Sequence, residues 1–171
     1  IQEVSGTFSK GDEIQKEMPH ADGGLLLFDL EGDGDLDLYV TSGGFRESLD
    51  NAEGGYNDRL YTNDGKGKFT LSESSPGGVT GSTVCVRGGD FDRDGDVDLF
   101  IGGRVIPHEF PLAPESYLLE NRNGNLVKVT QDRAPGIMRV GMVTDALWTD
   151  FDQDYDLDLI VVGEFMPVTI F

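Results

Sequence analysis

Short apolar runs, each bounded by Gly, Asp or other polar residues, recur along most of this chain. They lie at 25–28, 38–41, 83–86, 99–101, 143–148 and 159–162. Runs of this length that are rich in Val, Ile, Leu, Phe, Tyr and Thr are typical of β-strands, whereas helices need longer segments. Strands are therefore predicted at all six positions, grouped in three pairs.

Two further pairs of apolar runs enclose tight turns. Residues 59–62 and 68–71 flank the turn 63–67, and residues 117–119 and 126–129 flank the turn 121–125. Because these turns contain Asp-Gly and Asn-Gly, both pairs are predicted to form β-hairpins. Each complete repeat is thus expected to hold four strands, with a longer connection between the second and the third.

The loops between the paired strands share one acidic pattern. They span 29–37, 90–98 and 150–158, and their starts lie 61 and 60 residues apart. A fixed period of this kind indicates tandem structural repeats. We interpret residues 1–171 as a partial repeat domain, with segments 1–20 (a lead-in or the end of a preceding blade), 21–80, 81–140 and an incomplete third repeat, 141–171.

Four-stranded antiparallel sheets at this period are typical of β-propeller blades. The fold class is therefore predicted to be all-β, with about three consecutive blades of a larger propeller. A ring needs at least about four blades, whereas 171 residues hold roughly 2.9 repeats. We expect sequence outside this chain, or a partner chain, to supply the rest of the ring.

The negative charge of the chain is concentrated in the three acidic loops. The formal net charge is −19, and the three windows hold 15 of the 32 acidic residues against one basic residue, Arg93. Like charges packed so closely would destabilise a compact fold unless cations neutralised them. The distribution therefore points to bound metal, about three divalent ions per chain, and few basic residues are left for a nucleic-acid surface.

Alternating acids in a tightly curled loop suit calcium, which prefers six to eight oxygen ligands. Positions 1, 3, 5 and 9 would offer carboxylates, and position 7 would offer its carbonyl. Gly95 at position 6 permits the turn, whereas Tyr155 at the same position of the third loop would be strained. The candidate metal-binding residues are Asp29, Glu31, Asp33, Asp35, Asp37, Asp90, Asp92, Asp94, Asp96, Asp98, Asp150, Asp152, Asp154, Asp156 and Asp158.

An EF-hand, a magnesium or zinc site, and a solvated turn all fit the acidic loops less well. An EF-hand needs Glu at position 12 and flanking helices, but position 12 is Val40, Ile101 or Val161 inside a predicted strand. Magnesium keeps several waters and demands near-octahedral geometry, and zinc would need His or Cys ligands. A solvated turn explains any one loop, but three loops at one period favour metal binding.

These residues resemble the FG-GAP or VCBS repeats, whose calcium-loop blades also occur in integrin α-subunit propellers. The resemblance extends from about residue 25 to 171, and the segments 59–69 and 163–167 are similar to the bacterial secreted branch. The Phe-Gly/Gly-Ala-Pro signature itself is absent, so the likeness to integrins is one of loop and blade. The resemblance implies a propeller of seven or eight blades, structural calcium, and an extracellular, cell-surface or periplasmic location.

The sequence favours a binding protein over an enzyme. The histidines, His20 and His108, have no Ser or Cys partner in a recognisable motif, and Cys85 lies in an apolar run that predicts a buried core position. Trp148 is expected to pack between blades. We expect no catalysis, no membrane insertion, and an extracellular protein or glycan as partner. The alternative is the propeller part of a carbohydrate-active enzyme, such as a polysaccharide lyase.

Overall fold

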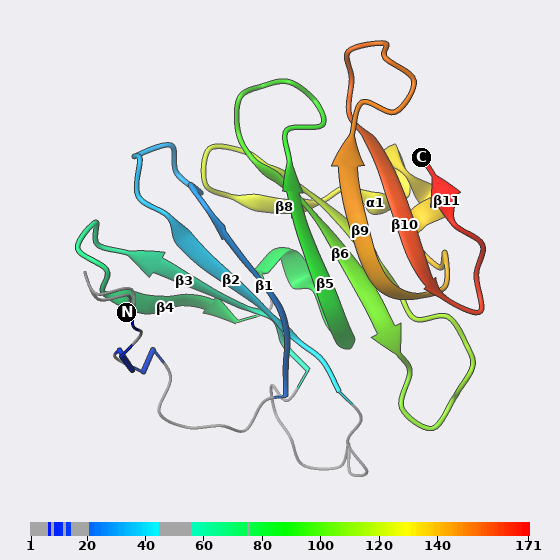
Figure 1. Ribbon diagram of the computed structural model, residues 1–171, viewed down its shortest axis with the longest axis horizontal. Coiled ribbons are helices and arrows are strands. Elements are labelled where there is room, and N and C mark those ends of the chain that lie inside the picture. The colour runs from blue at the N-terminus through cyan, green and yellow to red at the C-terminus, as the bar shows by residue number, and fades with distance from the viewer. Residues whose placement is uncertain (1–6, 8, 12, 15–20, 45–55, 75) are drawn as a thin grey trace.

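The computed structural model describes residues 7, 9–11, 13, 14, 21–44, 56–74 and 76–171, and three antiparallel sheets make up most of this part (Figure 1). The first sheet contains β1 (Asp22–Phe28), β2 (Asp37–Ser42), β3 (Arg59–Asn63) and β4 (Phe69–Ser74). The second contains β5 (Ser82–Gly89), β6 (Asp98–Val105), β7 (Tyr117–Asn121) and β8 (Leu126–Lys128). The third contains β9 (Met142–Thr149), β10 (Asp158–Glu164) and β11 (Thr169–Ile170).

Within each sheet, neighbouring strands are consecutive in the chain. This up-and-down order is that of propeller blades, and it confirms the predicted all-β fold of four-stranded antiparallel sheets. The segment 166–171 supplies β11, which pairs with β10 in the third-strand position. His20, most of the predicted lead-in 1–20 and residues 45–55 of the first long connection lie outside the described residues.

Short helical segments follow the fourth strands of the first two sheets. These helical segments were not predicted from the sequence. They are η1 (Pro76–Gly78), α1 (Thr130–Arg133) and η2 (Pro135–Ile137). The predicted strand 126–129 ends at Lys128 because the next ladder position is taken by a side chain: the hydroxyl of Thr130 accepts the Leu118 amide proton at 2.8 Å. The second sheet is therefore followed by the helical turn α1, which contacts β7.

Two apolar cores lie between the three sheets. The core between the first and second sheets includes Phe28, Tyr39, Leu60, Val86, Leu99 and Ile101. The core between the second and third sheets includes Cys85, Phe100, Val143, Leu159 and Val161. Because successive side chains of a strand point to opposite faces, β6 supplies both cores. The middle sheet is thus buried on both faces, and Trp148 packs against the second core as predicted.

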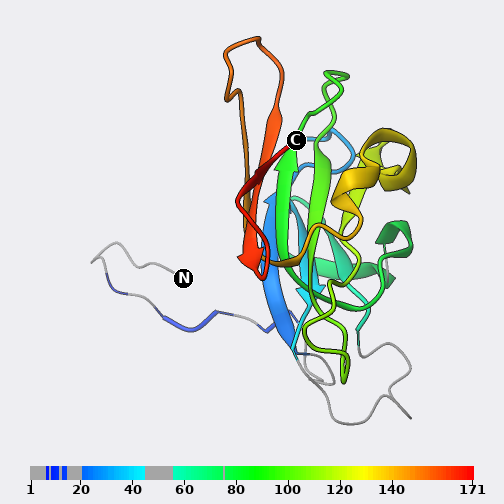
Figure 2. The ribbon, with the colours of Figure 1, turned by 90° about the vertical axis from the view of Figure 1, so that its right-hand side faces the viewer.

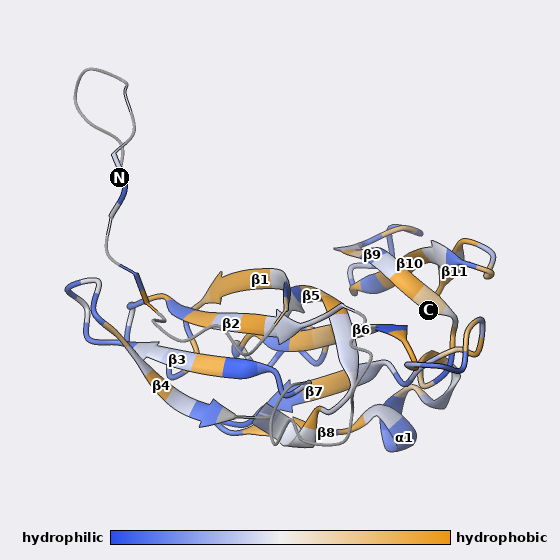
Figure 3. Cartoon of the chain, turned by 90° about the horizontal axis from the view of Figure 1, so that it is seen from below, coloured by the Kyte–Doolittle hydropathy of each residue, from blue (hydrophilic) through white to orange (hydrophobic). Residues whose placement is uncertain are grey.

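The first strands of the three sheets, β1, β5 and β9, lie next to one another in chain order. Figure 2 shows the sheets from the side, and Figure 3 shows them next to one another from below, with apolar segments in strands of each sheet. At Gly24 an added Cβ would lie 2.6 Å from the Val84 carbonyl oxygen, and at Gly23 it would lie 2.8 Å from the Val84 Cα. Glycine is therefore needed where β1 crosses β5.

The outward faces of the first and third sheets carry exposed apolar side chains, although Leu38 and Tyr61 on the same face of the first sheet are buried. Leu25 and Leu27 of β1 are 65% and 49% exposed, and Leu147 of β9 is 58% exposed. Each alternates with residues that pack inward, as strand geometry requires. Soluble proteins rarely leave large apolar patches uncovered, so these side chains are candidates for contact with a further layer. The described residues include no helix long and apolar enough to cross a membrane.

A buried carboxylate links the first two sheets. Asp58 is fully buried, and one of its oxygens accepts hydrogen bonds from the Ser42 amide at 2.8 Å and the Thr83 hydroxyl at 2.6 Å. Its other oxygen accepts the Tyr39 hydroxyl proton at 3.0 Å. Thr83 belongs to β5, whereas Tyr39 and Ser42 belong to β2, so this cluster spans the boundary between blades.

Candidate metal centre

The three acidic loops lie on one rim of the molecule. They connect β1 to β2, β5 to β6 and β9 to β10, and Figure 1 shows all three at the upper ends of the strands. The connections β6–β7 and β10–β11 leave from the opposite rim. Any metal bound by the loops would therefore sit along one edge of the stacked sheets.

The Asp at position 1 closes each loop through backbone hydrogen bonds. In the second loop, one oxygen of Asp90 accepts the Asp94 amide and the other accepts the Gly95 amide, each at 3.1 Å. Asp29 and Asp150 make the corresponding bonds in the first and third loops. These contacts curl the backbone of all three loops in the same way.

The Asp at position 9 ties each of the first two loops to its own sheet. Asp98 is fully buried, and its oxygens accept the Phe91 amide at 3.1 Å and the Asn121 amide at 2.8 Å. Asp37 is held in the same way by the amides of Leu30 and Asn63. Sequence reasoning missed the two Asn anchors, although each follows the third-strand run at the same place in its repeat.

Positive φ angles occur at positions 4 and 6 of every loop. The first loop has Gly at both positions, whereas the second has Arg93 at φ 64° before Gly95 at φ 98°. In the third loop, Gln153 lies at φ 66° and Tyr155 at φ 74°. The left-handed backbone expected at Tyr155 is therefore present, and position 4, which the sequence analysis did not single out, adopts it as well.

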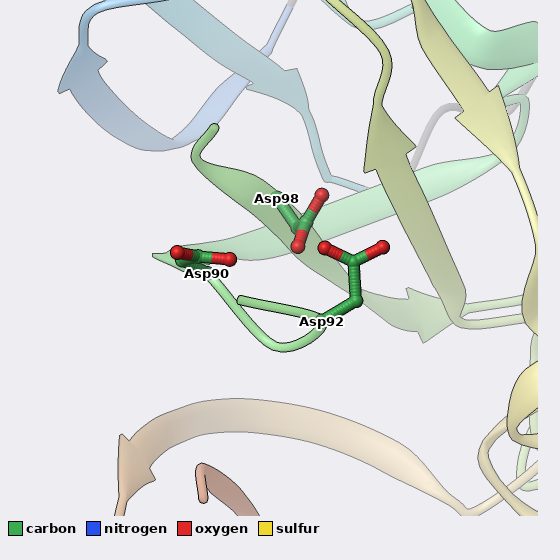
Figure 4. Close-up of side chains that lie close together, drawn as sticks. All are labelled: Asp90, Asp92 and Asp98. Carbon is green, nitrogen blue, oxygen red and sulfur yellow. The ribbon is translucent and has the colours of Figure 1, made fainter. Parts of the chain in front are cut away.

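The carboxylates of the second and third loops converge. Oxygens of Asp90, Asp92 and Asp98 lie within 4.8 Å of one another, and Figure 4 shows these side chains turned toward a common space. Asp150, Asp152 and Asp158 form the same group in the third loop. In the first loop, among the described residues, no such group forms, and Glu31 stands where the other loops have Asp.

The remaining acids of the loops face other partners. At position 5, the carboxylates of Asp33, Asp94 and Asp154 accept the amide of position 7 in their own loops. At position 7, the Asp96 carboxylate accepts the Asn123 amide of the β7–β8 turn at 2.9 Å. The Asp156 carboxylate lies 3.8 Å from the Arg93 guanidinium, and that of Asp35 lies against Gly65. The side chain of position 7 is therefore engaged outside the loop, and its backbone carbonyl is the group left to face a metal.

Negative charge is poorly compensated where the carboxylates meet. Burial raises the pKa of Asp98 to about 6, although hydrogen bonds from Asn121 and Phe91 act in the opposite direction. Burial, followed by the charge of Asp94, raises the pKa of Asp92. Burial also raises the pKa of Asp152, with a contribution from the charge of Asp154. A bound cation would remove this penalty by neutralising the charges.

One buried carboxylate oxygen of the second loop lacks a hydrogen-bond donor among the described residues, which indicates that the residues of this loop fit a metal ion. The Oδ1 atom of Asp92 is inaccessible to solvent and has no hydrogen-bond partner within the described part of the chain. Buried carboxylate oxygens are normally hydrogen-bonded or bound to metal. All the converging ligand atoms are carboxylate oxygens, which suits a hard cation such as calcium and not zinc.

Comparison with known proteins supports the resemblance drawn from the loops. Residues 29–101 match the family model of the FG-GAP-like repeat. The matched segment begins at the first acidic loop, includes the second loop and ends within β6. No curated protein matches the chain significantly.

Proposed function

We propose that the chain is a calcium-stabilised β-propeller segment, a proposal supported by the match of residues 29–101 to the FG-GAP-like repeat model. Each acidic loop binds one calcium ion through the carboxylates of positions 1, 3, 5 and 9 and the carbonyl of position 7. The ion neutralises the loop and fixes the rim of its blade. This role is structural, and it keeps the connections at the other rim in place for a partner.

The observation that carries the proposal is the unpartnered Oδ1 atom of Asp92. It is buried beside Asp90 and Asp98, where a proton donor is absent among the described residues and a third carboxylate adds repulsion. A calcium ion at this point would satisfy the oxygen and offset the repulsion at once. The third loop repeats the arrangement with Asp150, Asp152 and Asp158, which supports a second site of the same kind.

The setting that best suits such a segment is outside the cytoplasm. Extracellular calcium is abundant enough to fill sites of modest affinity, with dissociation constants of about 10⁻⁴–10⁻³ M. We propose a secreted or cell-surface protein whose long connections bind a protein or glycan ligand without catalysis. Assays of polysaccharide cleavage in calcium distinguish this role from the enzyme alternative, since the proposal expects no product.

Calorimetric titration of calcium into chelator-treated protein tests the proposal directly. We expect binding at three sites and the loss of one site in Asp92→Asn, which keeps the side-chain size and removes the charge. Glu109→Gln is the matched control, because Glu109 is an exposed acid on the opposite connection, and it should bind calcium like the wild type.

Thermal melting provides a second measurement of the same proposal. A ligand that binds only the folded state stabilises it by RT ln(1 + [Ca]/Kd), about 2.7 kcal/mol per site at a hundredfold excess over Kd. The midpoint should therefore fall when excess chelator is added. A midpoint that does not change with calcium or chelator would contradict a structural role for the ion.

A further inference from the structure

An acidic residue outside the three loops stands beside the second metal site. In the β6–β7 ladder, Leu99 pairs with Leu119, and continuing this register by one residue places Glu120 opposite Asp98. The next residue of β7, Asn121, donates its amide to Asp98, which confirms that the strands remain close there. Side chains of directly opposed residues lie on the same face, about 5 Å apart at Cβ, and like charges so placed destabilise a sheet.

The environment of Glu120 leaves one of its oxygens without a donor. The residue is only 7% exposed, and its Oε1 atom accepts a hydrogen bond from the Arg122 side chain at 2.6 Å. Its Oε2 atom is buried and makes no hydrogen bond to any described residue, and the Arg133 guanidinium lies 3.7 Å away. Two of the three buried side-chain atoms that lack partners in the described residues are thus carboxylate oxygens, of Asp92 and Glu120.

The two nearby arginines favour the charged form of Glu120, and the hydrogen bond from Arg122 lowers the pKa of this carboxylate. The side chains of Arg122 and Arg133 are 54% and 56% exposed, so their charges are well solvated. Exposed ion pairs contribute little, typically less than about 1 kcal/mol. The Oε2 atom of this charged carboxylate still lacks a hydrogen-bond donor among the described residues, and a cation between Glu120 and Asp98 would satisfy it.

The first repeat provides an internal comparison. In the β2–β3 ladder, Leu38 pairs with Tyr61, so the residue opposite Asp37 is Thr62. Position 3 of the first loop is Glu31, whereas the second loop has the shorter Asp92 at this position. The two repeats therefore differ both within the loop and on the neighbouring strand, and the second has one more acid around its site.

We propose that Glu120 is a calcium ligand of the second loop, contributing its Oε2 atom from the neighbouring strand β7 through one bridging water, since Glu120 lies outside the converging group of Asp90, Asp92 and Asp98. This inference rests on the proposed calcium binding by the loops. Calcium sites gain affinity with the number of charged ligands, so the second loop is the tightest site of the chain. The loop motif alone does not include this residue, because it lies 22 positions after Asp98 in the sequence.

Substitutions in both repeats test this assignment by calorimetry. Glu120→Gln should weaken the tightest calcium-binding event by about tenfold or more, which corresponds to about 1.4 kcal/mol. Thr62→Glu, which places an acid at the equivalent position of the first repeat, should strengthen binding at the first loop. Glu115→Gln is the control, since Glu115 pairs with Arg139 away from the loops, and it should leave all sites unchanged.

The possible results separate the ligand role from a structural one and from failure of calcium binding itself. If Glu120→Gln lowers the melting midpoint in chelator but leaves the calcium affinity unchanged, Glu120 only pairs with its arginines and the assignment is overturned. If the wild type binds no calcium, the proposed function fails first and takes the assignment with it. Thr62→Glu keeps the test decisive if Glu120→Gln does not fold, because unchanged affinity at the first loop would also overturn it.

Discussion

Asp58 shows how a single buried residue can give the fold a dependence on pH. Burial raises its pKa to about 6, although hydrogen bonds from Thr83, Ser42 and Tyr39 and the charge of Arg59 lower it. The unfolded value is near 4, so between about pH 4 and 6 the native state holds more protons than the unfolded state. The contribution of Asp58 to stability is therefore full below about pH 4 and declines as the pH rises to 6.

Asp58→Asn should remove this decline. The amide oxygen can still accept from Ser42 and Thr83, and the amide nitrogen can donate to the Tyr39 oxygen, but the buried Tyr39 O–H then loses its acceptor. The variant should therefore be less stable than the wild type at every pH, while its stability loses the decline between about pH 4 and 6. Urea unfolding without added calcium, compared between pH 4 and 8, measures the change. The acidic loops contribute the same pH dependence in both proteins. If the free energy of unfolding changes with pH equally in wild type and variant, this role of Asp58 is contradicted.

The residues of the acidic loops could be predicted from sequence because their spacing repeats three times. Asp58 could not be predicted in this way, since its partners Tyr39 and Thr83 lie 19 and 25 residues away along the chain. The anchoring role of Asn121 was equally hidden, because its contact with Asp98 depends on the register of β6 against β7. A local motif therefore reports candidate ligands, whereas the groups that orient them come from strand pairing.

At the scale of elements, the third loop has the least favourable backbone of the three. Tyr155 adopts φ 74° at the position where the other loops have Gly, and its side chain is 87% exposed, so no packing compensates. The guanidinium of Arg93, from the second loop, donates to the Tyr155 carbonyl and holds the turn from outside. A contact between neighbouring loops thus supports the strained one.

Tyr155→Gly should stabilise the protein. Left-handed backbone costs an ordinary residue roughly 1–2 kcal/mol, which the substitution to glycine removes. Glycine is also more flexible in the unfolded state, and this offsets about half of that stabilisation. We expect the free energy of unfolding to rise by up to about 1 kcal/mol. The reciprocal variant Gly95→Tyr, at the matched position of the second loop, should lower it, and urea titrations of both variants in excess calcium check the pair.

The strands could be predicted from sequence because each combines a short apolar run with Gly or Asp at its ends. The helical turn α1 could not, since the apolar pattern continues to Val129 and only the Thr130 hydroxyl ends the ladder with Leu118. The first loop also differs from expectation in its geometry: its sequence suits metal as well as the others, but its carboxylates are not grouped among the described residues. Position 3 of this loop carries the longer Glu31, whose pKa is raised by burial and then by its hydrogen bond to Asp37 and the charges of Asp37 and Asp33, and the placement of this side chain does not follow from spacing.

For the whole molecule, the middle sheet is covered on both faces, while the outer two sheets each expose apolar side chains on their outward faces. The clearest exposed residues are Leu25 and Leu27 on the first sheet and Leu147 on the third. Exposed apolar surface of this kind drives association in water, and we propose that further blades cover both faces in the complete ring. Without those blades, the two faces are free to meet in separate copies of the chain.

The 171-residue chain should therefore self-associate in calcium, and Lys at both Leu25 and Leu147 should reduce this association without lowering the melting midpoint. The control is Leu112→Lys, because Leu112 is similarly exposed, at 57%, but lies on the β6–β7 connection and on neither sheet face. Light scattering over a range of concentrations provides the mass. A wild-type chain that stays monomeric at every concentration would mean that these faces need no partner, and the prediction of a larger ring would then lose its physical support.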